Sequence, residues 1–377
     1  MKKVYFDNAA TTAMDPRVIQ EMVEVMELDF GNPSSSHGFG RQAKSKLEMA
    51  RKSIAKCAGA TAAEIVFTSG GTEGNNWVLQ SAVRDLGIKR IISSKIEHHA
   101  VLHVLESLHK SHNIQIDFVQ LDSDGAVKYA DLVRLLGQEI PTLVSLMHVN
   151  NEIGTVLDLV KTSRICQQHH AYFHSDMVQS MGKLTHDFSQ IPVDFAVASA
   201  HKFHGPKGVG FVYVKKGIPM QPILFGGEQE KGLRPGTESV PSIVGMARAL
   251  ELAYTELPQH TTAIQELKQY AYDQLLSRIP GCKLNGSLSG LHTLLNVQIP
   301  CSAKQQDMLL FQLDMKGIAV SRGSACQSGS PKPSHVLAEI LSETEQMHPS
   351  LRISFSHFNT KDEIDYFIDQ LNIILSN

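Results

Sequence analysis

The chain has 377 residues with 35 basic and 38 acidic side chains, long enough to bury a large core and to divide into two domains. Its charge is near neutral and contains no block of one sign, so nothing in it points to a nucleic acid or a membrane surface as a partner. No signal-peptide or membrane-span pattern occurs, so we expect a cytoplasmic protein. The five cysteines are odd in number and widely spaced, which fits neither a disulfide framework nor a zinc site.

Short apolar runs alternate with helical patterns over the first two hundred residues. Strands are predicted over residues 64–69, 90–94, 114–121, 142–149, 172–176 and 194–200. Helices are predicted from Pro16, over 41–57, from the glycine-rich turn at 70–76 through 86, and over 98–110 and 129–136. This alternation predicts a parallel sheet wound with helices.

The pattern changes after two long helices, which are predicted over residues 241–257 and 260–279. Strands then follow over 282–286, 293–299, 318–322 and 350–356, with helices over 303–316, 335–344 and 360–375. Mixed pairing of this kind is typical of a compact α+β domain. We therefore predict an α/β protein with a large, mostly parallel domain over residues 14–258 and a small domain formed by residues 1–13 and 259–377.

A glycine-rich turn follows the strand predicted over residues 64–69. Backbone N–H groups at the start of a helix bind phosphate, and glycine lets the backbone approach the anion closely. The spacing excludes a Walker phosphate loop because no lysine follows the glycines. The turn at 70–76 is thus either a phosphate cradle or a plain connection from strand to helix.

Lys202 stands two residues after the uncharged run 195–200 that Asp194 opens, and before Gly205 and Pro206, so we expect it at a strand end. A lysine beside apolar surroundings loses part of its preference for the charged form, and the neutral amine can form a Schiff base with a carbonyl such as that of pyridoxal phosphate. Asp176 ends the strand 172–176, where a carboxylate could keep the pyridine nitrogen of that cofactor protonated. The alternatives are a surface amine for Lys202 and a solvated or helix-capping carboxylate for Asp176.

Histidines gather around the start of the helix predicted over residues 98–110. His99 and His103 lie one helical turn apart, but no carboxylate or cysteine completes a metal-ligand set, so no metal site is expected. A histidine stacked on a planar cofactor is the better use of this position.

Cys326 lies in the segment 323–334, which has no large apolar side chain to anchor it in a core. We expect this segment to be exposed and mobile, and an exposed thiol can lose its proton and become a nucleophile. The alternative is an incidental surface thiol.

Ten short motifs follow one another along the chain. They are residues 7–12 (DNAATT), 32–35 (NPSS), 68–73 (TSGGTE), 97–98 (EH), 149–154 (VNNEIG), 176 with 179–180 (D, QS), 199–202 (SAHK), 236–237 (GT), 323–326 (GSAC) and 351–354 (LRIS). In this order they closely resemble the cysteine desulfurases of the NifS/IscS type, and the match covers nearly the whole chain.

The resemblance implies a fold-type I pyridoxal 5'-phosphate enzyme that works as a homodimer. Lys202 is then the Schiff-base lysine, Asp176 pairs with the ring nitrogen and His98 stacks on the ring. The remaining cofactor contacts implied are Asn151, Gln179 at the ring oxygen and, at the phosphate, Gly71, Thr72, Ser199, His201 and the partner subunit's Thr237.

The resemblance also implies the reaction, which converts L-cysteine to L-alanine. Asn151 and Arg352 hold the substrate carboxylate, and a guanidinium suits this because it binds a carboxylate through two parallel hydrogen bonds. Lys202 takes the α-proton, His98 exchanges a proton near the sulfur, and Cys326 receives the sulfur as a persulfide. The sulfur then passes to an acceptor protein, either an iron-sulfur scaffold or a tRNA-thiolation protein.

Two alternatives stay open at this point. A selenocysteine lyase or a small-substrate aminotransferase could share the fold, although an aminotransferase needs no thiol such as Cys326. A non-catalytic scaffold protein could also keep the fold.

Two departures from the family pattern bear on the cysteine segment and on partners. Arg322 precedes the cysteine segment where many relatives have a small residue. The chain stops at Asn377, soon after the last predicted helix, where some relatives continue into a scaffold-docking tail.

Overall fold

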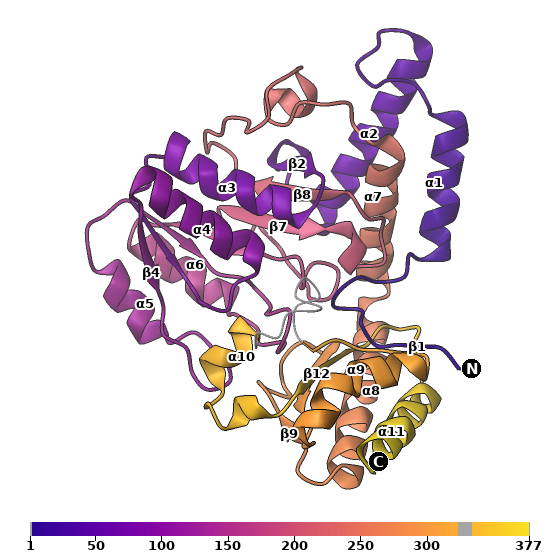
Figure 1. Cartoon of the computed structure of the whole chain (residues 1–377). Helices are drawn as coiled ribbons and strands as arrows, with labels where there is room; N and C mark the ends of the chain where they lie inside the picture. The colour runs from indigo at the N-terminus through magenta and orange to yellow at the C-terminus, as the bar shows by residue number, and fades with distance from the viewer. Residues whose placement is uncertain (1, 323–333, 377) are drawn as a thin grey trace.

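A computed structural model of the chain describes residues 2–322 and 334–376. It contains a larger unit built on a seven-stranded sheet and a smaller C-terminal unit, one above the other in Figure 1. None of the described helices is long and apolar enough to cross a membrane.

The large sheet has the strand order β2-β8-β7-β6-β5-β3-β4. Its strands are β2 (Ile65–Thr68), β3 (Arg90–Ser93), β4 (Gln115–Phe118), β5 (Thr142–Ser145), β6 (Tyr172–Asp176), β7 (Phe195–Ser199) and β8 (Gly210–Val214). Only β8 runs against its two neighbours, β2 and β7, so the predicted mostly parallel sheet is confirmed. Strand β8 had no counterpart in the sequence prediction.

Successive strand residues point to opposite faces of the sheet, and apolar residues lie on both faces. Helices therefore cover both faces. On one face Val66, Ile91 and Val197 pack with apolar residues of α3 (Gly71–Asp85) and α4 (His99–His112). On the other face Phe67 and Ile92 belong to a core shared with a second set of helices (Figure 1). That set is α1 (Pro16–Leu28), α2 (Gly38–Cys57), α5 (Tyr129–Leu136), α6 (Leu159–Gln168) and α7 (Val240–Thr255).

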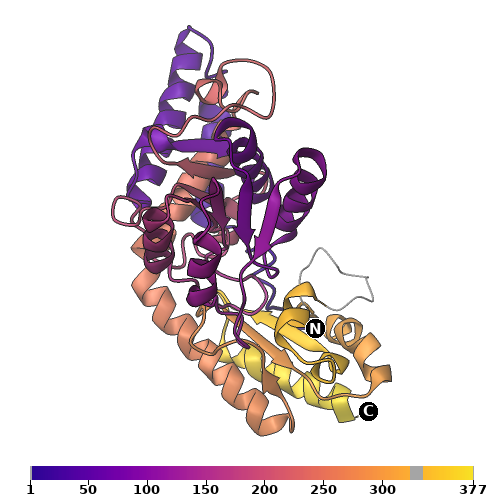
Figure 2. The same cartoon turned by 90° about the vertical axis from the view of Figure 1, so that its left-hand side faces the viewer.

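The C-terminal unit has its own core around a three-stranded antiparallel sheet of order β12-β10-β9. Its strands are β9 (Lys283–Leu284), β10 (Leu294–Gln298) and β12 (Ser350–Ser354). Its helices are α8 (Leu257–Arg278), α9 (Ala303–Met315), α10 (His335–Ile340) and α11 (Lys361–Ser376). Helix α8 follows α7 and runs along one edge of this unit in Figure 2.

The N-terminal strand belongs to the C-terminal half of the molecule. Strand β1 (Val4–Tyr5) pairs in parallel with β11 (Ile318–Ala319), and Val4 and Phe6 lie in the core of the C-terminal unit. The predicted small domain, which joins residues 1–13 to residues 259–377, assumes this placement of the N-terminal strand. The boundaries of the two domains remain a prediction.

Most predicted elements occur within a few residues of their expected ends. The differences are at element ends and in two missed elements, α6 and β8. Strand predictions ran long where apolar residues continue past the last paired residue: β5 ends at Ser145, whereas the pattern predicted a strand to residue 149.

Candidate active site

A cavity of about 250 Å³ opens where the parallel strands of the large sheet end and the C-terminal unit begins. Ligand sites of open α/β sheets lie at this edge because the loops that follow the strands converge there. Ten of the residues predicted from the sequence line the cavity: Gly71, Thr72, His98, Asn151, Asp176, Gln179, Ser199, His201, Lys202 and Arg352. Five further lining residues are Ala9, Ala10, Asn75, Met147 and Val178.

Lys202 ends a single 3-10 turn (η2, Ala200–Lys202) that follows β7 directly, at the strand end where it was expected. Its Nζ donates hydrogen bonds to the carbonyl oxygens of Ala9 (2.6 Å) and Ala10 (2.8 Å). These carbonyls belong to the N-terminal segment. The side chain is therefore held at the cavity wall by residues far away in sequence.

Asp176 is the last residue of β6 and is 5% exposed. Its Oδ2 accepts a 2.7 Å hydrogen bond from Nδ2 of Asn75, and its Oδ1 accepts a 3.0 Å hydrogen bond from the backbone N–H of Val178. Each oxygen of the carboxyl group thus has its own hydrogen-bond donor. The carboxylate is fixed in the cavity wall and does not cap a helix.

His98 caps the start of α4: its Nδ1 accepts a 3.1 Å hydrogen bond from the backbone N–H of Ala100. A neutral imidazole that accepts at Nδ1 carries its proton at Nε2. The pKa of His98 is lowered, first by burial, while Asp176 acts in the opposite direction and Lys202 in the same one. His98 thus offers a neutral ring with one N–H to the cavity.

The start of α3 has open backbone donors. Its N-cap is Gly70, which contributes no side-chain cap and has φ of 147°, a conformation that favours glycine. Ser199 lies across from it, since a Cβ on Gly70 would come within 3.4 Å of the Ser199 hydroxyl. The helix start, with its partial positive charge, is suited to an anion.

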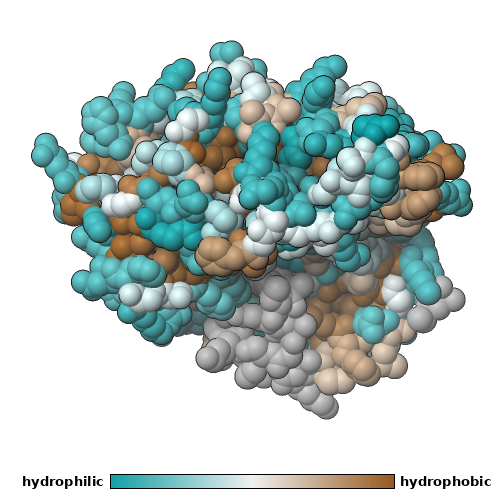
Figure 3. Space-filling view, turned by 90° about the horizontal axis from the view of Figure 1, so that it is seen from above, coloured by the Kyte–Doolittle hydropathy of each residue, from teal (hydrophilic) through white to brown (hydrophobic). Residues whose placement is uncertain are grey.

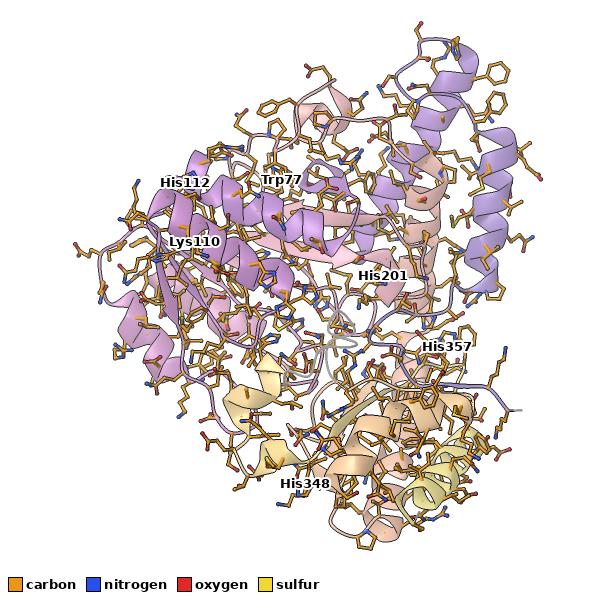
Figure 4. All side chains as sticks on the ribbon, in the orientation of Figure 1. Trp77, Lys110, His112, His201, His348 and His357 are labelled. Atoms are coloured by element: carbon orange, nitrogen blue, oxygen red, sulfur yellow. The ribbon has the colours of Figure 1, made fainter. Side chains whose placement is uncertain are left out.

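His201 lines the same cavity and lies near the centre of the molecule in Figure 4. Its Nδ1 lies 3.2 Å from the hydroxyl of Thr11. Burial lowers the pKa of His201 to about 4, and the neighbouring Lys202, Lys207 and Lys183 act in the same direction. The ring is therefore neutral at pH 7.

Arg352 reaches the cavity from β12 and is 2% exposed. One of its terminal nitrogens donates to the carbonyl oxygen of Asn151 (3.0 Å) and the other to the carboxylate of Asp7 (2.8 Å). Ser321 donates to the same Asp7 oxygen. The guanidinium thus links the two units at the cavity.

Gln179 is 3% exposed and lies in the turn after β6. Its Nε2 donates to the carbonyl oxygen of Ala9 (2.8 Å), and its Oε1 accepts a 3.1 Å hydrogen bond from Nζ of Lys183. The carbonyl oxygen of Ala9 therefore accepts from both Gln179 and Lys202.

One predicted site residue, Thr237, is not among those around the cavity and is exposed on the loop that precedes α7. Another, Cys326, lies outside the described residues. Sequence reasoning missed Asn75 and Lys183, which contact Asp176 and Gln179 directly. The spacing could have indicated that these residues lie near the site, since Asn75 is one helical turn after Gly71 and Lys183 is four residues after Gln179.

Comparison with known proteins gives one consistent result. The Aminotransferase class-V family model matches residues 4–367. The chain is 40% identical to "Cysteine desulfurase IscS" of Dictyoglomus turgidum, over 99% of this chain and 95% of that protein. Among solved structures, a NifS-like protein aligns over 100% of both chains with a TM-score of 0.91 and 37% identity. A structure described as SspA in complex with cysteine aligns over 95% of this chain and 100% of the other, with a TM-score of 0.83 and 30% identity.

Proposed function

Because the chain belongs to the cysteine desulfurases of the class V aminotransferase family, we propose that it takes the sulfur of L-cysteine with pyridoxal 5'-phosphate held in the cavity described above. The observation that carries the proposal is the convergence of Lys202, Asp176 and Arg352 on one cavity, from two different sheets. An amine, a carboxylate and a guanidinium are the groups that a pyridoxal enzyme needs toward an amino acid.

The residues around the cavity fit this cofactor. The uncapped start of α3, with Ser199 and His201 beside it, suits the phosphate group. Asp176 has a hydrogen-bond donor at each oxygen, which fixes the carboxyl group where a protonated pyridine nitrogen would pair with it. Lys202 would hold the cofactor carbonyl, with His98 against the ring and Gln179 at the ring oxygen. When bound, pyridoxal phosphate withdraws electrons from the α-carbon of an amino acid joined to it.

The protein's own groups bind the substrate and move protons. Arg352 and Asn151 hold the carboxylate of L-cysteine, which orients the α-hydrogen toward Lys202. Nζ of Lys202 takes this proton once the amine is free and neutral. Nε2 of His98, which carries the ring's proton, exchanges it near the substrate sulfur.

Cys326 receives the sulfur. Its thiolate attacks the sulfur of L-cysteine and a new S–S bond forms, while the bond between that sulfur and the β-carbon breaks. The electron pair of the broken bond stays with the carbon, which takes a proton and leaves as part of L-alanine. The enzyme keeps a persulfide on Cys326, whose outer sulfur then passes to an acceptor, an iron-sulfur scaffold or a tRNA-thiolation protein.

The test is the production of alanine and sulfide from L-cysteine with dithiothreitol, for the parent protein, Cys326→Ala and Lys202→Ala. We expect both variants to lose turnover, while Cys326→Ala keeps the visible absorption of the bound cofactor. Release of sulfur by Cys326→Ala at the parent rate would exclude the persulfide route. A parent protein that stays colourless with added pyridoxal phosphate would exclude the cofactor.

We further propose that the chain forms a homodimer through the end of the large unit that carries α1, α2 and the loop before α7. Phe225 on that loop is 91% exposed, and Phe30 and Phe39 are also exposed, with their rings 5.3 Å apart. Figure 3 looks onto this end and shows apolar patches between polar side chains. Exposed apolar clusters of this kind are typical of contacts between subunits. In the dimer, the partner subunit's Thr237 would reach the phosphate.

The dimer is tested by measuring the mass in solution with light scattering. The parent should have twice the chain mass, and Phe225→Asp together with Phe39→Asp should shift it toward one chain. A parent that runs as a single chain at micromolar concentration would contradict the proposal.

A further inference from the structure

Lys183 lies between two cavities. One is the cavity of the candidate active site, which its hydrogen-bond partner Gln179 lines. The other lies behind it, at the junction of the two units, and is lined by Lys183 together with Lys202, His292 and His357. Figure 4 marks His357 at this junction. The proposed reaction gives Lys183 no role.

The contact of Lys183 determines the orientation of the Gln179 amide. The two ends of that amide meet different partners: the carbonyl oxygen of Ala9 lies 2.8 Å from Nε2, and Nζ of Lys183 lies 3.1 Å from Oε1. Turning the amide over would place two oxygens against each other at Ala9 and two donors against each other at Lys183. Both partners therefore favour the orientation in which the NH2 group lies at Ala9, which is itself part of the cavity wall.

The surroundings of Lys183 disfavour a positive charge. Lys202 and Arg352 both act on it as like charges, and His201, His204 and His292 all lie near enough to be affected by it. Burial lowers the pKa of Lys183 to about 7, with Lys202 and Arg352 acting in the same direction. Both forms of the amine still donate hydrogen bonds, so the contact with Oε1 survives loss of the charge.

We propose that Lys183 is a positioning residue for the cofactor: it holds the amide of Gln179 with its NH2 group at the Ala9 side, ready to donate to the ring oxygen of pyridoxal phosphate. The inference rests on the proposed function, because it assigns a role toward that cofactor. Lys183 acts through Gln179 and does not contact the reacting atoms. Without it, only the Ala9 carbonyl oxygen still favours this orientation, so the amide turns over more readily and then presents an oxygen to the ring oxygen.

The test is a double-mutant cycle on cofactor binding, because residues that act through one contact are not additive. Pyridoxal phosphate is titrated into cofactor-free protein and followed by its visible absorption. The proteins are the parent, Lys183→Met, Gln179→Leu and the double variant, with Lys183→Arg as the conservative change. Lys161→Met is the matched control, since Lys161 is an exposed lysine whose ammonium lies over the ring of Tyr129.

We expect Lys183→Met to weaken cofactor binding about tenfold, the effect of losing one hydrogen bond to a charged group. In the Gln179→Leu background the same change should weaken it less than about twofold, because the amide is already absent. Lys183→Arg should stay within about threefold of the parent, because it still offers a donor to Oε1. The Lys161→Met control should match the parent.

Two results would overturn the inference. Equal losses from Lys183→Met in both backgrounds would mean that Lys183 acts only as a charge on the cavity. No loss in either background would mean that it only fills space. The melting temperature of each cofactor-free variant identifies one that fails to fold, and then Lys183→Leu, which also lacks a donor, replaces Lys183→Met with the same expected results in the two backgrounds. Failure of the proposed function is distinct, since the parent itself would then bind no pyridoxal phosphate.

Discussion

The side-chain amide of Asn75 donates a hydrogen bond of 2.7 Å to Oδ2 of Asp176, and both residues are buried. It joins α3, one helical turn after its first residue, to the end of β6, and these two elements are proposed to hold the phosphate and the pyridine nitrogen. The bond is one of the two that fix the position of the Asp176 carboxyl group.

Replacing Asn75 with Leu should therefore weaken the binding of pyridoxal phosphate about tenfold, as expected for the loss of a hydrogen bond to a buried charge. Titration of cofactor-free protein by visible absorption measures this. Asn76→Leu is the control, since Asn76 donates only to the carbonyl of Thr72 within its own helix. An unchanged affinity for Asn75→Leu would show that the donor from Val178 alone suffices.

Arg352→Lys should raise KM for L-cysteine at least about tenfold and leave the absorption of the bound cofactor unchanged. The guanidinium reaches Asn151 and Asp7 through separate nitrogens, and a lysine cannot keep both contacts and also bind a carboxylate. Steady-state kinetics separate KM from kcat. Arg278→Lys, in an exposed pair with Asp369, is the control and should behave as the parent. A fall in kcat with KM unchanged would count against a role in binding the substrate carboxylate.

Glu97 makes the stability of the protein depend on pH. Burial raises its pKa to about 8, with Asp176 adding to the rise, while hydrogen bonds from Met147 and Ser94 oppose it. The folded protein then keeps this proton up to about pH 8, whereas the unfolded chain loses it near the ordinary glutamate pKa of 4.5. Folding therefore takes up a proton between these values, and the free energy of unfolding falls as the pH rises through that window, by about 1.4 kcal/mol per pH unit for this one group.

Glu97→Gln removes this dependence, because the amide keeps the acceptor at Oε1 and has no proton to lose. The stability of the variant relative to the parent should increase from pH 5.5 to pH 7.5, and denaturant unfolding of the cofactor-free proteins measures it. A constant difference between variant and parent across this range would contradict the raised pKa.

Arg51 and Glu230 form a buried pair that anchors the loop carrying Thr237. The Arg51 guanidinium donates to both carboxylate oxygens of Glu230, at 2.7 and 2.6 Å, and the backbone N–H of Phe67 donates to one of them. Glu230 and Lys231 both have positive φ, at 51° and 60°, so this anchor offsets backbone strain as well as burial of the charges.

Glu230→Ala leaves the buried Arg51 cation with only the more exposed Glu48 carboxylate at its Nε, which costs about 3–5 kcal/mol of stability. Glu106→Ala, which removes the partner of the exposed Lys110, should cost far less, because water screens an exposed pair. Denaturant unfolding compares the two. If the partner subunit's Thr237 contacts the phosphate, Glu230→Ala should also weaken cofactor binding, and a loss of stability with full cofactor affinity would separate the loop from the cofactor site.

Much of this architecture could be read from local patterns. Helix α5 begins and ends where its apolar spacing predicts, and the carboxyl ends of β6 and β7 deliver Asp176 and Lys202 as expected. The contacts that fix these side chains could not be predicted in the same way. The bonds from Lys202 to Ala9 and Ala10, and from Arg352 to Asp7, join residues separated by most of the chain, and no local spacing encodes which distant carbonyl or carboxylate a cation will meet. Asn75 was overlooked because a polar residue on the first turn of a helix is usually solvated.

The pairing of β1 with β11 determines when, during synthesis of the chain, the protein can complete its cofactor site. The segment that includes Ala9 and Ala10 leaves the ribosome early, but Val4 pairs with Ile318, which is made only after the whole large sheet. Until then the segment is held only by its bonds to the large unit, such as those from Gln179 to Ala9 and from Thr12 to His201, and Arg352 has not yet been made. A nascent or truncated chain that lacks β11 and β12 can thus build the sheet, yet it should retain the cofactor more weakly than the complete chain. Tight loading with pyridoxal phosphate would then be a late event that reports completion of the chain.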